Sequence, residues 1–342
     1  MKTWKKAGLT ALAGSLVATS AFAGAVTVSG TANLTYTGNT GAQDNGANAV
    51  PTVGDDSTDG QRWGLNKSIS FAGSGEMDNG WTVSISHTLL DGGSTGIGMT
   101  LDMGDAGSLD FQGDNGGSRG IGKIKDKIPT ADEGVDNGLD ANGTTALGGV
   151  SGTVTGGATG FHYSKSLDMV SIGIGYMPKG GSTNTPGGVG GAGAVASTTS
   201  AFVTIDPMDG LEIGFGVGEQ AATTAGDKNQ TDDMDTMYAS YVYGPLTVAY
   251  QVSNIDTYTS GQADDEQTRW GVLYAVNDEL SVSYQEHVND DTTATDEEAS
   301  GWSASYTVGS MTFKAHRNKG TNLGNTTGQE SEHTEIGVTF AF

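Results

Sequence analysis

The sequence predicts an all-β protein, a transmembrane antiparallel β-barrel of about 16 strands. Three observations predict this fold: an export segment at the N-terminus, apolar and polar side chains that alternate every second residue after it, and connections that are short and long in turn. Cysteine is absent, which excludes disulfides, thiolate metal sites and thiol nucleophiles.

The first residues have the three parts of a secretory signal peptide. A cationic start with three lysines precedes an apolar run from Ala7 to about Ala18, and Ala21 and Ala23 provide the small residues of a cleavage site. The run is too short for a helix that crosses a bilayer, which needs about 20 residues. We therefore expect cleavage of residues 1–23, a mature domain of residues 24–342 and a location outside the cytoplasm.

The net charge is strongly negative. Asp and Glu number 40 against 16 Lys and Arg, a formal charge of −24, and loss of the three leader lysines takes this to −27. Such a chain repels phosphates, so nucleic-acid binding is excluded. No long amphipathic helical pattern follows residue 24, which argues against soluble helical domains. A secreted β-repeat protein or adhesin would show a fixed short period, whereas the spacing here is irregular.

Alternation begins as soon as the export segment ends. Val28, Leu34 and Tyr36 fall on one face of an extended segment, while Thr31 and Asn33 fall on the other. Similar series recur along the chain and give sixteen strand candidates, at residues 26–36, 63–71, 81–89, 99–103, 109–111, 161–163, 170–176, 202–205, 211–217, 237–243, 246–252, 270–276, 280–284, 302–308, 311–315 and 336–342. The stretch 197–206 alternates poorly. An even number of strands is what a closed bacterial barrel requires.

The connections also alternate in length. Short ones carry the Gly, Pro, Asn and Asp residues of tight turns, near residues 105–107, 167–168, 207–210, 244–245, 277–279 and 309–310. Longer polar segments lie between them, at about 38–60, 115–158, 180–197, 221–232, 256–266, 290–298 and 320–331. Aromatic residues fall near strand ends, where an interfacial girdle is expected: Trp81, Tyr243, Tyr284, Tyr306, Phe313 and Phe342. Short turns at the periplasmic rim and long loops outside are the outer-membrane arrangement.

Three segments resemble the general porins of Gram-negative bacteria, especially the trimeric alphaproteobacterial type. They are Asp78–Ser84 at the start of a strand, the hairpin Gly98–Phe111, and the closing strand Gly337–Phe342. The resemblance implies a homotrimer in the cell outer membrane, in contact with lipid and lipopolysaccharide. It also implies that the third loop, about 115–158 and the longest connection here, folds into the lumen. Phe340 and Phe342 look like the signal that the barrel-assembly machinery reads.

Two features depart from that resemblance. The Pro-Glu-Phe signature of enterobacterial third loops is absent. Lys67 falls on the lipid-facing side of its strand, where a charge costs a few kcal/mol at mid-depth. A subunit interface, a nearby bulge or a different register would each explain that lysine.

The lumen and the third loop supply the candidate residues of a pore constriction. A porin lumen selects by its diameter and by the charges that line it. The candidates are Arg62, Arg119, Lys123, Lys125, Lys127, Asp132, Glu133, Asp136, Asp140, Arg269 and Lys314, with His162 and His316 as weaker ones. Facing rows of opposite charge would produce a transverse field. The plain alternative is that these charges are solvated and take no part in the pore.

Acidic clusters mark several loop tips, at 55–56, 232–235, 264–266, 290–291 and 296–298. They are expected to enrich cations near the mouth and to bind divalent cations weakly or not at all, because none has the ligand spacing of a dedicated calcium loop. Five histidines are present, and none lies in a nucleophile motif that we recognise. We expect no catalytic residue, no cofactor, no specific metal site and no enzymatic activity.

The sequence thus predicts a water-filled channel for passive diffusion of small hydrophilic solutes and ions, with a lean towards cations. Two alternatives stay open. One is a channel biased towards phosphate, sugars or amino acids, and the other is a non-conducting structural or adhesive surface barrel.

Overall fold

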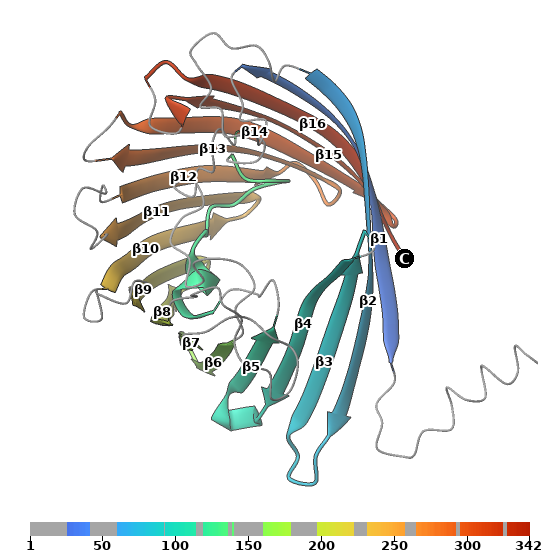
Figure 1. Cartoon of the computed structure of the whole chain (residues 1–342), viewed down its shortest axis with the longest axis vertical. Helices are drawn as coiled ribbons and strands as arrows, with labels where there is room; N and C mark the ends of the chain where they lie inside the picture. The colour runs from blue at the N-terminus through green and yellow to red at the C-terminus, as the bar shows by residue number, and fades with distance from the viewer. Residues whose placement is uncertain are drawn as a thin grey trace, which may run out of the picture.

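The computed structural model confirms a closed antiparallel barrel of sixteen strands (Figure 1). It describes residues 26–41, 60–91, 93–113, 119–135, 139, 160–178, 197–221, 231–256, 265–291, 295–323 and 327–342. The strands are β1 (Thr27–Gly41), β2 (Gly60–Glu76), β3 (Thr82–Leu90), β4 (Gly93–Asp102), β5 (Ser108–Gly113), β6 (Gly160–Leu167), β7 (Val170–Met177), β8 (Thr198–Met208), β9 (Leu211–Ala221), β10 (Thr231–Tyr243), β11 (Leu246–Asp256), β12 (Asp265–Ala275), β13 (Leu280–Asp291), β14 (Glu297–Val308), β15 (Met311–Thr321) and β16 (Glu330–Ala341). Two short 3₁₀ helices, η1 (Gly104–Ala106) and η2 (Gly120–Ile124), complete the described elements.

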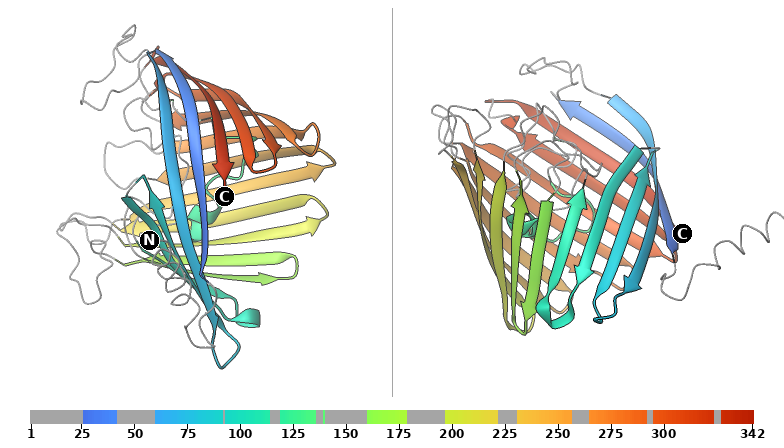
Figure 2. Two further views of the ribbon diagram at one scale, coloured as in Figure 1. Left: turned by 90° about the vertical axis from the view of Figure 1, so that its right-hand side faces the viewer. Right: turned by 60° about the horizontal axis from the view of Figure 1, so that its bottom comes forward.

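Each strand pairs with its sequence neighbours, and β1 closes the ring by pairing with β16. The register of this seam sets Leu34 opposite Val338 and continues through Tyr36 and Ile336. At its end, Gly30 and Phe342 exchange two backbone hydrogen bonds of 2.9 and 3.0 Å. The chain therefore begins and ends its barrel at the same place, as Figure 2 shows from two further directions.

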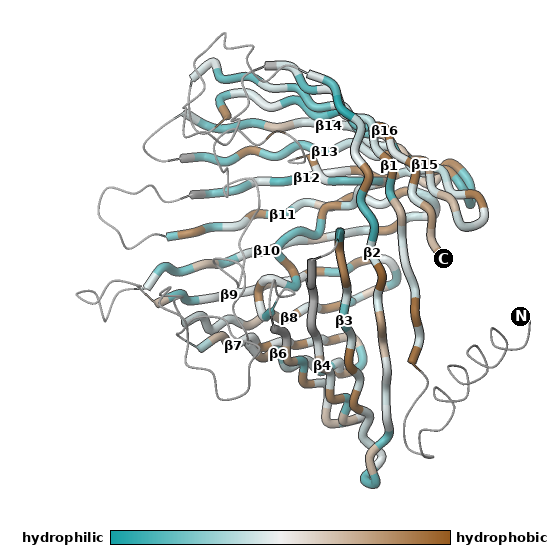
Figure 3. The backbone as a smooth tube through the Cα atoms, turned by 45° about the vertical axis from the view of Figure 1, so that its right-hand side comes forward, coloured by the Kyte–Doolittle hydropathy of each residue, from teal (hydrophilic) through white to brown (hydrophobic). Residues whose placement is uncertain are grey.

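The predicted alternation sets which side chains face outward. On β9, Ile213, Phe215 and Val217 are 40–47% exposed, and the glycines between them are buried on the inside. Figure 3 shows apolar and polar residues following one another along the strands. This is the reverse of a soluble protein, because the apolar atoms face outward towards lipid and the polar atoms face the interior.

The two rims differ as the sequence predicts. One rim carries turns at 77–81, 103–107, 168–169, 209–210, 244–245, 276–279 and 309–310. Gly210 (φ 80°) and Gly244 (φ 57°) adopt the left-handed conformation that such turns need. The other rim carries the long connections, with one exception: β3 and β4 are joined through residues 91–92 alone.

The short connection leaves part of β2 without a second neighbour. The β2–β3 pairing runs from Glu76 to Ser68, so Gly60–Lys67 pairs with β1 only. Lys67 lies opposite Ala32 and faces outward, which confirms the predicted register. Its ammonium lies 3.2 Å from the Asp91 carboxylate, so the charge is paired at the end of this hairpin.

Two irregularities interrupt the ladder. The β3–β4 register shifts between His87 and Thr88, leaving Gly96 without a partner. The β8–β9 register shifts between Ile205 and Met208. The weakly alternating stretch 197–206 is nonetheless the strand β8. Among the described residues, no helix is long and apolar enough to cross a bilayer.

Candidate functional site: the barrel lumen and its third loop

The inner wall of β10–β13 is polar and buried although it lies inside a transmembrane fold. Its side chains come from alternate positions, and those under 9% exposed include Thr236, Gln251, Ser253, Gln267, Arg269, Ser283, Gln285, His287 and Asn289. A buried polar wall requires hydrogen-bond partners, since an unsatisfied polar group costs about 1–3 kcal/mol. The third loop supplies many of them.

The described part of the connection between β5 and β6, residues 119–135 and 139, is called loop 3 below. Figure 1 shows it inside the ring of strands, where it runs along the inner wall from η2 towards β14 and β15. Ile121 and Ile124 of η2 are fully buried and pack against Met234 and Tyr238 of β10. The predicted inward fold of the third loop is therefore observed in these residues.

Glycines on the wall allow η2 to lie against bare backbone. A Cβ added to Gly175 would stand 2.5 Å from the Gly120 nitrogen, and one added to Gly216 would stand 2.9 Å from both Ile121 and Ile124. Contacts below 3 Å force something to move. The glycines of β7 and β9 therefore determine how closely η2 approaches the inner wall.

Gln251 of β11 clamps the middle of loop 3. It is fully buried, and its amide nitrogen donates to the carbonyls of Ile124 (2.8 Å) and Lys125 (3.2 Å). Its amide oxygen accepts from the Lys127 nitrogen at 2.8 Å. One neutral side chain thereby satisfies three backbone groups of the loop.

Gln285 of β13 repeats this arrangement further along. It donates to the Pro129 carbonyl and accepts from the Val135 nitrogen, both at 3.0 Å. Beside it, the Ser283 hydroxyl accepts from the Ala131 nitrogen at 3.0 Å, and the Ser303 hydroxyl accepts from the Asp132 nitrogen at 3.1 Å. Together with Asn318, which donates to the Gly134 carbonyl, these residues hold the loop to β13, β14 and β15.

Three loop charges pair with charged or titratable side chains of β9, β12 and β15. The Asp132 carboxylate lies 2.7 Å from Lys314 and 3.0 Å from His316. Asp126 lies 3.4 Å from Arg269, and Lys127 lies 3.5 Å from Glu212. Each pair joins the loop to the strand behind it, so the charges offset one another locally.

The surroundings of Asp132 favour its charged form. Burial by itself would raise the pKa of this carboxyl, but hydrogen bonds from His316 and Lys314 and their positive charges outweigh burial and lower the pKa below its ordinary value. The side chain is only 3% exposed. Asp132 is therefore a buried anion held between two partners.

Arg119 stands at the start of loop 3 and is 1% exposed. Burial lowers the pKa of its guanidinium from the ordinary value. A Cβ at Gly160 of β6 would stand 3.0 Å from its Nε atom, so this arginine lies directly against the wall. It is placed behind the loop and away from the channel water.

The structure thus divides the predicted constriction residues into groups. Arg269, Lys314, Asp132 and Lys127 are brought together along the seam between loop and wall. Lys123 and Glu133 stay exposed on the loop, and Lys125 is half-buried. Arg62 faces the lumen from β2, where its neighbour on β1 is Thr37. Asp136, Asp140, Ala21 and Ala23 lie outside the described residues.

The weaker histidine candidates both face inward and touch loop 3. The Gly120 nitrogen donates to His162 Nδ1 at 3.1 Å, and His316 bonds Asp132. Among the described residues, no three His, Asp or Glu side chains gather in a group that could hold a metal ion.

The lumen faces of β1, β2 and β3 form a contrasting surface, called the open wall below. None of the hydrogen bonds or ion pairs described for loop 3 reaches it. Between Arg62 and Glu76 of β2, most of its side chains are hydroxyls and amides, among them Thr31, Asn33, Thr35, Asn66, Ser68, Ser70 and Thr88. They bond across strands, Thr31 to Ser68 and Ser70 to Thr88, each at 2.8 Å.

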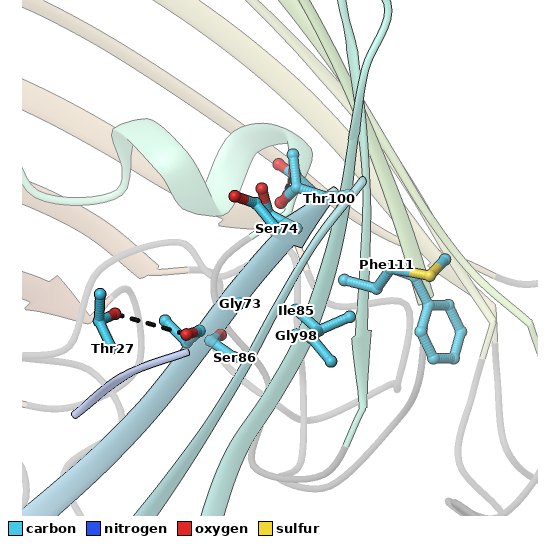
Figure 4. A pocket seen from close by; sticks show the side chains of 12 residues that line it. Thr27, Gly73, Ser74, Ile85, Ser86, Gly98, Thr100 and Phe111 are labelled. Atoms are coloured by element: carbon cyan, nitrogen blue, oxygen red, sulfur yellow. Dashed lines mark hydrogen bonds between the residues drawn. The ribbon is translucent and has the colours of Figure 1, made fainter. Parts of the chain in front are cut away.

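A pocket of about 370 Å³ lies against β2–β5, and Ser74, Ser84 and Ser86 of the open wall are part of its lining. Figure 4 shows Ser74 and Thr100 on one side of these strands and Phe111 on the other. The Thr100 hydroxyl donates to Asp110 at 2.7 Å on the lumen face. The lining residues thus come from both faces of these strands, and those on the lumen face also belong to the inner wall of the barrel.

Sequence reasoning missed the neutral residues that hold the loop. Gln251, Gln285, Ser283 and Ser303 occupy inward positions of alternating strands, so the alternation did identify them as lumen-facing. Which of them touch loop 3 depends on the side of the barrel against which the loop lies. That choice is tertiary and leaves no local signal.

Comparisons with known proteins agree with this geometry. A family model described as Gram-negative porin matches residues 8–307. The sequence has no significant match among curated proteins.

Similar solved structures include an anion-selective porin from Comamonas acidovorans (14% identity, TM-score 0.63, covering 93% of this chain and 99% of that one). The outer-membrane channel DcaP of Acinetobacter baumannii is also similar (12%, 0.65, 95% and 99%). A third is OmpT of Vibrio cholerae (12%, 0.62, 95% and 99%). At these identities the similarity to solved structures shows the fold alone. The family match over residues 8–307 shows the family: the chain belongs to the Gram-negative porins.

Proposed function

We propose that the protein is a passive channel of the outer membrane for small hydrophilic solutes and ions, and that loop 3 forms its constriction. The observation that carries this is the seating of loop 3. It is fastened to the inner wall from β6 to β15, whereas the open wall of β1–β3 receives none of the described loop bonds. A loop held to one side narrows a lumen, and a loop that crossed it would plug it.

Single-channel recording tests this proposal. The purified protein in planar bilayers should give stepwise conductance, and deletion of residues 119–140 should raise the step size. A variant with a shorter deletion in the β9–β10 connection, residues 222–230, should keep the step size of the wild type. A barrel without steps would be a structural or adhesive surface protein, and an unchanged step after the loop 3 deletion would place the constriction elsewhere.

We propose a homotrimer whose subunits meet at β15, β16, β1 and β2. The outward face there carries a groove lined by Tyr36, Gln61, Arg317 and Glu332, with the two charges 2.6 Å apart. Polar groups facing lipid are costly, so a covering neighbour suits this sector better than acyl chains. The opposite sector, around Val217, is apolar and suits lipid.

The lack of cysteine gives a clean test of this arrangement. Gln61→Cys should cross-link between subunits with a short bismaleimide, and Val217→Cys should not. Cross-linking at Val217 alone would refute the assigned sector. Absence of cross-links at both sites, with a monomeric mass in detergent, would refute the trimer.

Export and assembly complete the proposal. Removal of residues 1–23 is expected, and the mass of the mature protein tests it. Phe342 is 74% exposed at the barrel seam, where the terminal residues of the chain are accessible to assembly machinery. We expect lipid and lipopolysaccharide to surround the outward face, with weak divalent-cation bridging at the acidic loops.

A further inference from the structure

We propose that the constriction of this channel is a neutral hydrogen-bonding slot, selective for small uncharged solutes with many hydroxyl groups, such as sugars and polyols. The inference rests on the proposed channel function and specifies its substrate class. The observation behind it is the open wall, most of which carries no charged side chain. On the opposite side, the charges of loop 3 and its wall form ion pairs.

The open wall carries no charge over most of its height. Along β2, the lumen-facing residues after Arg62 are Gly64, Asn66, Ser68, Ser70, Ala72 and Ser74, and the next charge in this row is Glu76 at the end of the strand. From Thr27 to Asn39, the lumen positions of β1 are all Ser, Thr or Asn. On β3 they are Thr82, Ser84, Ser86 and Thr88, with the apolar Leu90 at the end of the strand.

The charges at the top of this wall offset one another. Thr37 of β1 lies between Arg62 of β2 and Glu335 of β16 in the same row of the ladder. Neighbouring strands are about 4.8 Å apart, so the two charged residues stand roughly 10 Å from each other at the backbone. Below this row, β16 offers Gly337 and Thr339, and the Thr339 hydroxyl donates to Asn33 at 3.1 Å.

The loop side does not supply a facing row of charge either. Lys314, Arg269 and Lys127 each have an acidic partner within 3.5 Å. The exposed charges of the described loop are Lys123 near β8 and β9, Asp126, which pairs with Arg269, and Glu133, next to the Gly134 carbonyl that Asn318 of β15 holds. Lys123 and Glu133 have opposite signs. No row of one sign therefore confronts a row of the other across the described lumen.

Such a slot treats neutral and charged solutes differently. An ion that enters a narrow passage sheds part of its hydration, and only a wall charge of opposite sign replaces it well. A polyol exchanges bonds to water for bonds to hydroxyls and amides at little net change. A hydroxyl serves as donor and as acceptor, so the wall matches solutes that present both. Aromatic side chains are absent from the open wall, so stacking on sugar faces contributes nothing here.

The acidic outer rim acts separately from this slot. It enriches cations by a long-range field that salt screens over about 8 Å at physiological ionic strength. A weak cation preference at low salt that vanishes near 1 M salt would come from the rim. Selectivity that survives 1 M salt would come from the constriction.

Three solutes on one six-carbon skeleton provide the test: glucose, glucosamine (positive) and gluconate (negative). We expect proteoliposomes with the full-length mature barrel to swell faster in glucose than in either ion by at least about threefold, because the neutral wall does not replace the hydration that an ion sheds. Planar-bilayer reversal potentials in 1 M salt should lie near zero. Equal swelling, faster entry of either ion, or charge selectivity in 1 M salt would overturn the inference and leave the channel intact. Absence of both swelling and conductance would instead overturn the proposed channel.

Variants of the open wall sharpen this experiment. Asn66→Arg introduces a cation into the neutral row and should raise the gluconate to glucose ratio by about threefold or more. Asn66→Gln, which also lengthens the side chain but leaves it uncharged, should keep the wild-type ratio. If the arginine variant fails to fold, Asn33→Arg on the adjacent strand makes the same prediction, and an unaltered ratio in a folded arginine variant would refute the role of the open wall.

Discussion

Gly30 and Phe342 close the barrel against each other. Two backbone hydrogen bonds join them, and the Phe342 ring occupies the space that a side chain at residue 30 would need, with ring carbons 2.6 and 2.7 Å from an ideal Cβ. The Phe342 ring thus covers the backbone of β1 at Gly30, where the two strands of the seam meet. Closure and the terminal phenylalanine are one structural feature.

Gly30→Val should weaken this seam. The new side chain would displace the ring or the strand, at a cost of about 1–3 kcal/mol for overpacking. Gly38→Val is the matched control, because the nearest atom to a Cβ there is 4.0 Å away. The measurement is the fraction of protein that migrates as the folded, heat-modifiable form. Equal fractions for the two variants would show that the ring contact is dispensable.

Gln251→Leu should loosen the middle of loop 3. The substitution removes the partners of two loop carbonyls and one loop N–H, each costing about 1–3 kcal/mol if left buried and unsatisfied. Faster tryptic cleavage at Lys125 and Lys127 in the assembled barrel, together with noisier open-channel current, is the expected result. Thr199→Leu, on the outward face of β8 away from the proposed subunit interface, should cause neither change. Protection equal to wild type would mean that Gln285 and the ion pairs hold the loop without Gln251.

Asp132→Asn should destabilise the far end of the loop by roughly 2 kcal/mol, the scale of a hydrogen bond to a charged group. Lys314 and His316 would lose the carboxylate between them. We expect more frequent excursions between conductance levels in single-channel records. Glu133→Gln alters the adjacent exposed carboxylate and should leave the records unchanged, so a similar effect of both variants would point to general loop charge.

Acid should reproduce the loss of Asp132 within a defined window. The folded-state pKa of Asp132 is lower than its ordinary value, so its ionisation stabilises the docked loop above the unfolded pKa of about 3.9. That contribution is lost as pH falls through the lower, folded-state pKa. Channel records should therefore stay constant from pH 7 to pH 5 and become unstable only below about pH 4. Instability that begins at pH 6, or that persists unchanged in Asp132→Asn, would exclude this carboxyl as the cause.

The barrel could be predicted from the sequence because the alternation within each strand shows which of its side chains face the lumen and which face outward. A two-residue period needs only local information, so the outward position of Lys67 and the inward positions of Arg269 and His316 follow from counting. Asp91, the ion-pair partner of Lys67, was not foreseen, because the β3–β4 connection is a tight hairpin on the rim of long loops.

The constriction was harder to predict because it depends on contacts between distant segments. Charge drew attention to Arg119, which is buried behind the loop, and away from Gln251, which holds it. Lys314 and Asp132 were both candidates, but only the folded loop shows that they neutralise each other from the same side. Strand direction and side-chain parity are local properties, whereas the partner of a lumen residue is set by the path of a loop.

The glycine seat under η2 has a consequence for how the bore of this channel is calibrated. Gly175 and Gly216 lie behind η2, and a methyl on Gly175 would meet the backbone of Arg119 and Gly120, so that the start of the loop would have to move away from the wall. The diameter of the pore thus depends in part on residues that lie behind loop 3. A narrower sieve needs no new atom on the surface that solutes touch.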